Sequence, residues 1–292
     1  MTRTFAGVFP ALTTPFHDDE SIDFDCLQEN VRRLERGGVH GVVPVGTTGE
    51  SATMSHDEHI EVIEAVVDAV EEIPVIAGSG SNNTREALAL SRRAADAGAD
   101  GLLLISPYYN KPEPAGMEAH FRTIADEIDL PQIIYNVPSR TGRNIAVETA
   151  VNLASHENIA GYKAASGDLN RVAEVIERTR HEEFTVLSGD DQLTLPIMSM
   201  GGTGTISVAG NVEPERTSTM VDYALAEDYE AARELHYELG PLFRTLFIES
   251  NPIPVKEALA IRGEMPPTMR QPLSRMGEEN LETLRGVLAD LE

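Results

Sequence analysis

The chain has 292 residues, of which 41% are hydrophobic, so it can bury the core of one large domain or two small ones. Its net charge of −25 argues against a nucleic-acid or anionic-lipid partner. No apolar run reaches the length of about 18 residues that a membrane-spanning helix needs, and the N-terminal segment is a poor signal peptide.

The few lysines and the single cysteine also bear on the cellular setting. Only Lys111, Lys163 and Lys256 are lysines among the 23 basic residues, and the many acidic residues are dispersed along the chain. This composition predicts adaptation to a salty cytoplasm, where salt screens the repulsion between acidic groups. Cys26 is alone, which excludes an intrachain disulfide and fits a reducing cytoplasm.

Short apolar segments alternate with segments of helical period along most of the chain. The segments 56–70 and 84–98 each place apolar residues on one helical face, with Asn83 or Thr84 as a cap and Gly98 as a stop. This rhythm predicts a parallel (β/α)₈ TIM barrel, with an open doubly wound sheet as the alternative. Strands are predicted at 7–12, 41–45, 74–78, 101–106, 132–137, 159–164, 184–188 and 204–209.

After about residue 213 the strand pattern ends and the remaining sequence has a helical pattern. This is more helix than one barrel needs. We therefore predict a barrel domain over residues 1–225 and a C-terminal helical region over 226–292, which packs on the barrel or on a neighbouring subunit.

Polar residues follow several of the predicted strands. A barrel places its active site at the carboxyl ends of its strands, so these side chains could converge at one mouth. They are Thr47, Thr48, Tyr108, Tyr109, Tyr135, Arg140, Lys163, Asp190 and Asp191.

Lys163 is the strongest catalytic candidate because it lies in the apolar stretch IAGYKAA. Burial disfavours the charged amine and should lower its pKa, and a neutral amine forms a Schiff base with a carbonyl. The alternative is a structural lysine paired with a carboxylate. The scarcity of lysine favours the imine, since Arg can serve most ion pairs but cannot form an imine. Lys111, in a loop, and Lys256, at a helix start, are weaker candidates.

Other residues near the predicted mouth could support this chemistry. Tyr135 could relay protons, although a strand tyrosine is often only a core residue. The hydroxyls of Thr47 and Thr48 suit a small carboxylate, and Arg140 could bind a second carboxylate or be a surface residue. His56 and His59 lack a third metal ligand, and neither GGTGT nor GSG completes a nucleotide-binding motif, so no metal or cofactor is predicted.

Over nearly its whole length the chain resembles the dihydrodipicolinate synthase branch of the class I pyruvate-dependent lyases. The motifs are GTTGESAT, PYYNKP, YNVPSRTG, GYKAASGD, SGDD, GTISVAGNV and NPIPVK. The resemblance implies a barrel with C-terminal helices that assembles as a homotetramer of two tight dimers. It also implies the condensation of pyruvate with L-aspartate 4-semialdehyde to 4-hydroxy-tetrahydrodipicolinate, on the route to diaminopimelate and lysine.

The resemblance assigns a role to each matching residue. Lys163 would form the Schiff base, and the hydroxyl relay would join Tyr135, Thr47 and Tyr109, the last from a neighbouring subunit. The substrate-binding residues would be Thr48 for the pyruvate carboxylate, Arg140 for the semialdehyde carboxylate, Gly189, and the main chain at Ile206.

Two positions depart from the family pattern, at Tyr162 before the lysine and Ala164 after it. They leave open a sister aldolase that acts on a 2-keto-3-deoxy sugar acid or on N-acetylneuraminate. A non-catalytic barrel with a binding role is the third possibility. The sequence SRTG after YNVP favours the synthase.

Some members of the family bind free L-lysine as an inhibitor at the tight-dimer interface. We predict a corresponding effector site in this chain, where Glu86 could pair with the ligand's α-ammonium group and His56 could meet its other end. The residues of this set are Ser51, Ala52, His56, His59, Asn82, Glu86 and Tyr108.

Overall fold

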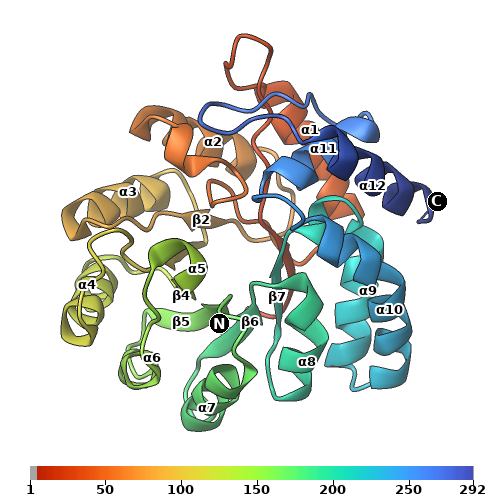
Figure 1. Cartoon of the computed structure of the whole chain (residues 1–292). Coiled ribbons are helices and arrows are strands. Elements are labelled where there is room, and N and C mark those ends of the chain that lie inside the picture. The colour runs from red at the N-terminus through yellow and green to blue at the C-terminus, as the bar shows by residue number, and fades with distance from the viewer. Residues whose placement is uncertain (1–4, 292) are drawn as a thin grey trace.

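The computed structural model describes residues 5–291, in which parallel strands form a ring surrounded by helices (Figure 1). The strands are hydrogen-bonded in the order β1-β7-β6-β5-β4-β3-β2, and every pair is parallel. They are β1 (Gly7–Pro10), β2 (Ile76–Gly78), β3 (Gly101–Ile105), β4 (Gln132–Asn136), β5 (Ile159–Ala164), β6 (Thr185–Ser188) and β7 (Gly204–Ser207).

The segment 41–45 fills the gap between β1 and β2. Val43 forms a parallel bridge with Ala11, directly after β1, and Val42 forms one with Val75, directly before β2. These bridges close the ring, and the eight parallel positions confirm the predicted (β/α)₈ barrel over an open sheet.

This eighth segment was predicted as a strand, but it does not form a regular one. Pro44 has no N–H to donate to a neighbouring strand. Val45 has a φ of 50°, which turns the backbone out of the extended region. The chain therefore leaves the barrel early at this point and enters the loop that begins at Gly46.

Helices surround the ring, and side-chain caps mark where several of them begin. The predicted cap Asn83 accepts a hydrogen bond from the N–H of Arg85, and Ser55 and Glu58 form a capping box at the start of α2. The helices outside the C-terminal region are α1 (Phe24–Arg36), α2 (His56–Val67), α3 (Thr84–Asp96), α4 (Pro114–Glu127), α5 (Pro138–Thr141), α6 (Val147–Ala154), α7 (Leu169–Thr179), α8 (Thr194–Ser199) and α9 (Pro214–Leu225).

The C-terminal region is helical, as predicted, with α10 (Tyr229–Thr245), α11 (Ile253–Ile261) and α12 (Glu278–Ala289). In Figure 1 these helices lie beside the barrel, and α11 and α12 are near α1. One apolar cluster joins Val8 of β1 with Leu239, Val255 and Leu284 of these helices. The helical region therefore shares a core with the barrel, and the boundary after residue 225 stays a prediction. Residues 1–4 of the predicted barrel domain lie outside the described range.

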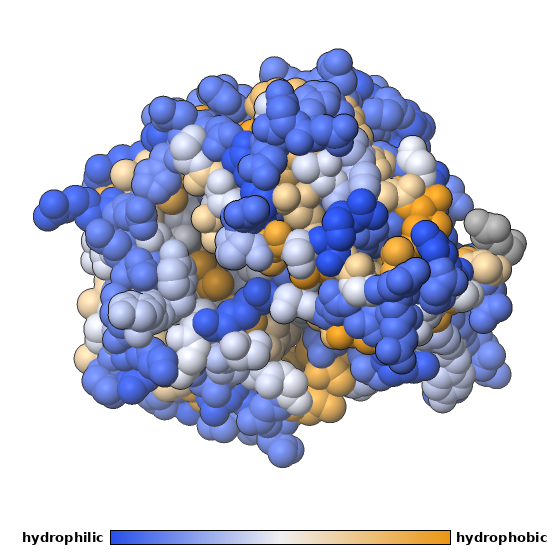
Figure 2. Space-filling view, turned by 45° about the horizontal axis from the view of Figure 1, so that its top comes forward, coloured by the Kyte–Doolittle hydropathy of each residue, from blue (hydrophilic) through white to orange (hydrophobic). Residues whose placement is uncertain are grey.

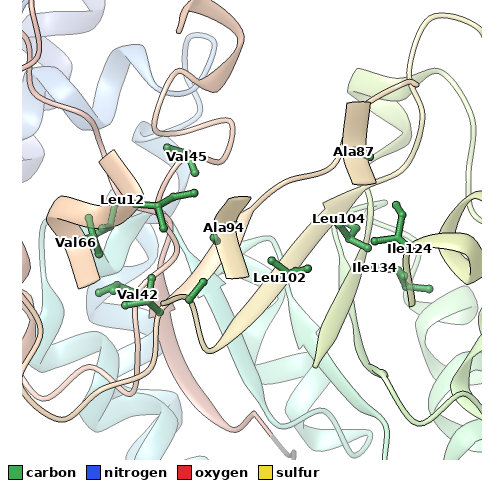
Figure 3. Packing of buried hydrophobic residues seen from close by; sticks show 14 of the residues in the cluster. Leu12, Val42, Val45, Val66, Ala87, Ala94, Leu102, Leu104, Ile124 and Ile134 are labelled. Atoms are coloured by element: carbon green, nitrogen blue, oxygen red, sulfur yellow. The ribbon is translucent and has the colours of Figure 1, made fainter. Parts of the chain in front are cut away.

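Alternation along the strands separates an outer apolar layer from the barrel interior. Leu102 and Leu104 of β3 face the helices, where they pack near Ala94 of α3 and Ile124 of α4 (Figure 3). Leu103, between them, belongs to the interior cluster. This period of two fixes which side chains of each strand can reach a site inside the barrel.

The same alternation places Lys163 inside the barrel. Its neighbour Tyr162 packs in the outer layer with Ile134. Lys163 lies in register with Tyr135 of β4 and Leu187 of β6, which both belong to the interior cluster. The departure from the family pattern at Tyr162 therefore changes the layer under the helices and not the interior.

The face shown in Figure 2 is mostly hydrophilic, and hydrophobic residues show at depth where it is hollowed. None of the helices within residues 5–291 is both long enough and apolar enough to cross a membrane.

Candidate active site

A cavity of about 690 Å³ opens at the carboxyl ends of the strands. The residues that line it follow the strands in turn, as expected for a barrel active site. They include Thr47, Thr48, Gly80, Ser81, Tyr108, Tyr135, Ser139, Arg140, Lys163, Ala165, Gly189, Asp190 and Val208, with Phe247, Asn251, Pro252, Pro272 and Leu273 from the C-terminal region.

Lys163 lies on the wall of this cavity and is only 6% exposed. We find no hydrogen bond or ion pair from its Nζ to any of residues 5–291. Burial lowers the pKa of Lys163 to about 7, and the nearby Asp191 opposes this shift. A substantial fraction of the amine is therefore neutral near pH 7, in the form that attacks a carbonyl carbon.

Gly189 gives the lysine side chain room to move. A Cβ built at this glycine would lie 2.9 Å from Cε of Lys163 and 2.9 Å from Cβ of Ala165. Any larger residue would crowd the lysine. The structure thus places the predicted Gly189 directly beside the amine.

Tyr135 lies next to Lys163 on the neighbouring strand. Nζ of Lys163 is 4.2 Å from the centroid of the Tyr135 ring. Burial raises the pKa of Tyr135 to about 12, with a smaller opposing effect from Arg140. The phenol therefore stays protonated near neutral pH and can donate a proton or a hydrogen bond to a group bound at the amine.

The loop after the segment 41–45 presents the two predicted threonines. Thr48 is buried, Thr47 is partly buried, and both line the cavity. The Thr48 hydroxyl oxygen accepts a hydrogen bond of 2.9 Å from Nδ2 of Asn251, which leaves its own proton available for a carboxylate. A second hydrogen bond stabilises the loop, because the Thr14 hydroxyl donates to the Gly49 carbonyl at 2.8 Å.

Arg140 comes from the short helix α5 and also lines the cavity. Its Nη2 donates to the main-chain carbonyl of Asn251 at 2.9 Å. The guanidinium has further N–H groups that could bind a carboxylate. Asn251 therefore contacts both Thr48 and Arg140, but reasoning from the sequence did not single it out. The only signal was its place in the motif NPIPVK.

Asp191 organises the turn after β7 and does not face the cavity as a ligand. Its buried carboxylate accepts hydrogen bonds from the Ser207 hydroxyl and from the N–H groups of Val208 and Ala209, the latter at 3.0 and 2.9 Å. Ile206, within β7, is buried inside the barrel and is not among the cavity-lining residues, whereas Val208 is. Contact between a ligand and the Ile206 main chain stays a prediction.

The other two lysines have different surroundings. Lys111 is exposed in the loop after β3. Lys256 is fully buried, and its Nζ lies 2.5 Å from Oε1 of Glu50. The structural ion pair that was the alternative for Lys163 is therefore present at Lys256.

The predicted effector residues line the same cavity, apart from Asn82. His56 contacts Glu86, with Nε2 3.1 Å from Oε1, and Nε2 of His59 lies 2.7 Å from the Gly78 carbonyl oxygen. Asn82 does not line the cavity, and its carbonyl accepts a hydrogen bond from Asn110. The set in the cavity wall is Ser51, Ala52, His56, His59, Glu86 and Tyr108.

Tyr109 points away from the cavity of its own chain. It is 90% exposed and has a φ of 67°, whereas the adjacent Tyr108 lines the cavity. The relay that was predicted to join Tyr109 with Tyr135 and Thr47 is thus incomplete within one chain.

No cluster of three or more His, Cys, Asp or Glu side chains within residues 5–291 is arranged to hold a metal ion. The groups that line the cavity include an amine, phenols, hydroxyls and a guanidinium. This set can bind carboxylates and transfer protons around an imine.

Comparison with known proteins agrees with this geometry. The model of the dihydrodipicolinate synthetase family matches residues 4–291. A 4-hydroxy-tetrahydrodipicolinate synthase of Natronomonas pharaonis is 73% identical over 289 residues, which cover 99% of this chain and 98% of the relative.

Two solved structures have nearly the same fold. The dihydrodipicolinate synthase of Acinetobacter baumannii, complexed with pyruvate, superposes with a TM-score of 0.97 at 41% identity and 99% coverage of both chains. The enzyme of Cyanidioschyzon merolae, with lysine bound, has a TM-score of 0.93 at 38% identity and 98% coverage of both chains. The resemblance seen in the sequence motifs is confirmed: the chain belongs to the dihydrodipicolinate synthetase family of lyases.

Proposed function

We propose that the chain condenses pyruvate with L-aspartate 4-semialdehyde to 4-hydroxy-tetrahydrodipicolinate, as a step toward diaminopimelate and lysine in the cytoplasm. The observation that supports this most is the unpaired, buried Lys163 with its pKa near 7 beside Tyr135. The name of the relative at 73% identity supports the identity of the reaction.

The reaction begins when Nζ of Lys163 attacks the carbonyl carbon of pyruvate. Loss of water gives an imine, and loss of a proton from the methyl carbon gives the enamine that attacks the aldehyde carbon of the second substrate. The amino group of that substrate then displaces Lys163 from the imine carbon and closes the ring. Tyr135, protonated and adjacent, delivers and receives the protons of these steps.

The carboxylates of the two substrates bind at different parts of the cavity. Thr48 binds the pyruvate carboxylate through its hydroxyl, and the hydroxyl of Thr47 belongs to the proton relay with Tyr135. Arg140 binds the carboxylate of the semialdehyde through the guanidinium N–H groups that Asn251 does not occupy. The pyruvate complex of the Acinetobacter baumannii relative supports pyruvate as the substrate that forms the imine.

The relay is completed by a second subunit. Tyr109 is almost fully exposed and turned away from its own cavity, so it can enter the cavity of a neighbour. The functional unit is then at least a dimer, and we propose a homotetramer built from two such dimers. Sedimentation velocity on the native protein and on Tyr109→Phe measures the assembly separately from activity.

The assay that tests the function measures turnover of pyruvate with each candidate aldehyde. We expect turnover with L-aspartate 4-semialdehyde and little with the aldehydes of sugar-acid aldolases. Arg140→Ala should lower turnover of the semialdehyde far more than formation of the imine, because pyruvate does not need Arg140. Equal loss of both would show that Arg140 supports the fold or the interface instead.

We also propose that L-lysine binds on the side of the cavity formed by His56, His59 and Glu86. Support comes from the pairing of His56 with Glu86 and from the lysine-bound structure of the Cyanidioschyzon merolae relative. Calorimetric and activity titrations with L-lysine should show binding to the native protein and weakened binding to His56→Lys, which adds a like charge. Absence of binding to the native protein at millimolar lysine would refute this proposal.

A further inference from the structure

The C-terminal motif NPIPVK holds the threonine loop at two points. Nδ2 of Asn251 donates to Thr48 across 203 positions of sequence. Nζ of Lys256 donates to Oε1 of Glu50 at 2.5 Å across 206 positions. Glu50 closes the loop that carries Thr47 and Thr48, so the ion pair is two residues from a predicted substrate contact.

The ion pair is completely enclosed, and its hydrogen-bonding groups have partners. The Lys256 and Glu50 side chains are both 0% exposed. Nζ of Lys256 also donates to the Thr14 carbonyl at 3.0 Å and lies 4.4 Å from the centroid of the Phe16 ring. Oε2 of Glu50 accepts the N–H of Arg270 at 3.1 Å. A buried ion pair with this many partners resists displacement, because removal of one member leaves the other charge unpaired.

The backbone of Glu50 explains why the loop needs such an anchor. Glu50 has a φ of 57°, in the left-handed region that a non-glycine residue adopts only at a cost. Its N–H donates to the Thr47 carbonyl at 3.1 Å, and its carbonyl accepts the N–H of Thr53 at 2.9 Å. The anchored side chain therefore holds the turn that determines where the threonine hydroxyls lie.

We propose that Lys256 and Glu50 are positioning residues whose buried ion pair sets the place of the Thr47–Thr48 turn in the wall of the cavity that Lys163 also lines, and thereby the affinity for the carboxylate of pyruvate. The proposal rests on the proposed function, since it takes Thr48, in the same turn as Thr47, to bind that carboxylate. It also explains why this chain, which uses Arg at most basic positions, keeps a lysine at 256. The enclosed space holds a compact ammonium group between the Glu50 carboxylate, the Thr14 carbonyl and the Phe16 ring. The guanidinium group of an arginine is broader and planar, so it would not fit this space in the same way.

The matched control lies on the same helix. Glu257 is buried next to Lys256 in the sequence, and its Oε2 accepts a hydrogen bond of 2.9 Å from Nη2 of Arg275. This second ion pair ties α11 to the segment before α12 and has no contact with the threonine loop among the described residues. Glu257→Gln therefore perturbs α11 without releasing the loop.

The test compares Glu257→Gln with the double variant Lys256→Met, Glu50→Gln. The double variant removes both charges, so it leaves no unpaired charge in the interior and should fold. Borohydride trapping of the pyruvate adduct at Lys163, measured against pyruvate concentration, gives the half-saturating concentration separately from the maximum yield. We expect the double variant to need roughly tenfold more pyruvate at an unchanged maximum yield, because small displacements of positioning groups have effects of at least this size.

The control should saturate at the pyruvate concentration of the native protein even if its melting temperature falls. The proposal is overturned if the double variant also saturates there, or if Glu257→Gln raises that concentration as much as the double variant does. Failure of the native protein to form any adduct would be a different result, because it would refute the proposed function itself.

Discussion

Lys163 and Lys256 are two buried lysines in one chain with opposite roles. Each Nζ lies over an aromatic ring, at 4.2 Å from the centroid of Tyr135 for Lys163 and 4.4 Å from that of Phe16 for Lys256. Lys256 also contacts the Glu50 carboxylate, whereas Lys163 has no carboxylate in contact among residues 5–291. Burial alone therefore does not make a lysine reactive.

The carboxylate decides which form of the amine the protein stabilises. Burial is the largest effect on the pKa of both lysines and lowers it in both, but at Lys256 the Glu50 carboxylate opposes the shift through a direct ion pair and hydrogen bond. At Lys163 the opposing carboxylate, Asp191, does not form an ion pair with the amine, and the pKa falls to about 7. The surroundings of Lys256 thus stabilise the fold through an ion pair, whereas those of Lys163 leave its amine available for reaction.

The largest difference should appear in covalent chemistry. Lys163→Met should abolish the borohydride-trapped pyruvate adduct and lower turnover by about 10³-fold or more, because no other lysine can form the imine. Peptide mapping of the trapped native protein should place the added mass on Lys163 alone. An adduct on Lys111 or Lys256 would contradict the assignment, and those two residues serve as internal controls.

The comparison also predicts stability changes of opposite sign. Lys256→Met should lower the free energy of unfolding by about 3–5 kcal/mol, because Glu50 would remain buried without its partner. Lys163→Met should raise it by about 1 kcal/mol, since it removes a buried amine that lacks a carboxylate partner. Urea denaturation at pH 7 measures both changes. A loss of stability in Lys163→Met as large as that in Lys256→Met would show that both lysines stabilise the fold to the same extent.

The pH dependence follows from the lowered pKa of Lys163. Below about pH 7 the amine is increasingly protonated, so the rate of adduct formation should fall roughly tenfold per pH unit, and above pH 7 it should level off. Stopped-flow or quenched trapping at saturating pyruvate measures this profile. A rate that keeps rising to pH 10 would show that Lys163 titrates like an exposed lysine.

The same shift affects stability with a defined sign. The folded protein gives up the Lys163 proton near pH 7, whereas the unfolded chain keeps it up to the ordinary lysine range. The unfolded chain therefore binds more protons between these values, and this residue makes the free energy of unfolding rise with pH across that window. The contribution should be absent in Lys163→Met.

Local features of the fold and the site were predictable from the sequence. The strands follow from short apolar runs between segments of helical period, and the burial of Lys163 follows from its place in one of these runs, which needs no knowledge of distant residues. The irregular segment 41–45 was missed because a strand-like run of Val outweighed the effect of Pro44.

Contacts between residues far apart in the chain could not be predicted from the sequence pattern. Asn251 and Lys256 contact the threonine loop from more than 200 positions away, as the separations of 203 and 206 show. No periodicity encodes which side chain of α11 meets which loop. The orientation of Tyr109 out of its own cavity is likewise a property of the folded loop, where its φ is positive.

The smallest expected effect concerns salt, and it separates the exposed charges from the buried pair. The net charge of −25 comes from acidic residues dispersed along the chain, and the face shown in Figure 2 is mostly hydrophilic, so self-repulsion should grow as salt is removed. The screening length rises from about 3 Å at 1 M to about 10 Å at 0.1 M, so the melting temperature should fall by several degrees over this range. Differential scanning calorimetry at constant pH measures this change.

The ion pair of Lys256 and Glu50 lies out of reach of dissolved ions, since both side chains are 0% exposed. Salt should therefore change its contribution little. The double variant Lys256→Met, Glu50→Gln should have a shifted melting temperature but the same dependence on salt as the native protein. A native melting temperature that is flat across this range would count against adaptation to high salt. A salt dependence that disappears in the double variant would show instead that the buried pair, and not the acidic surface, is its source.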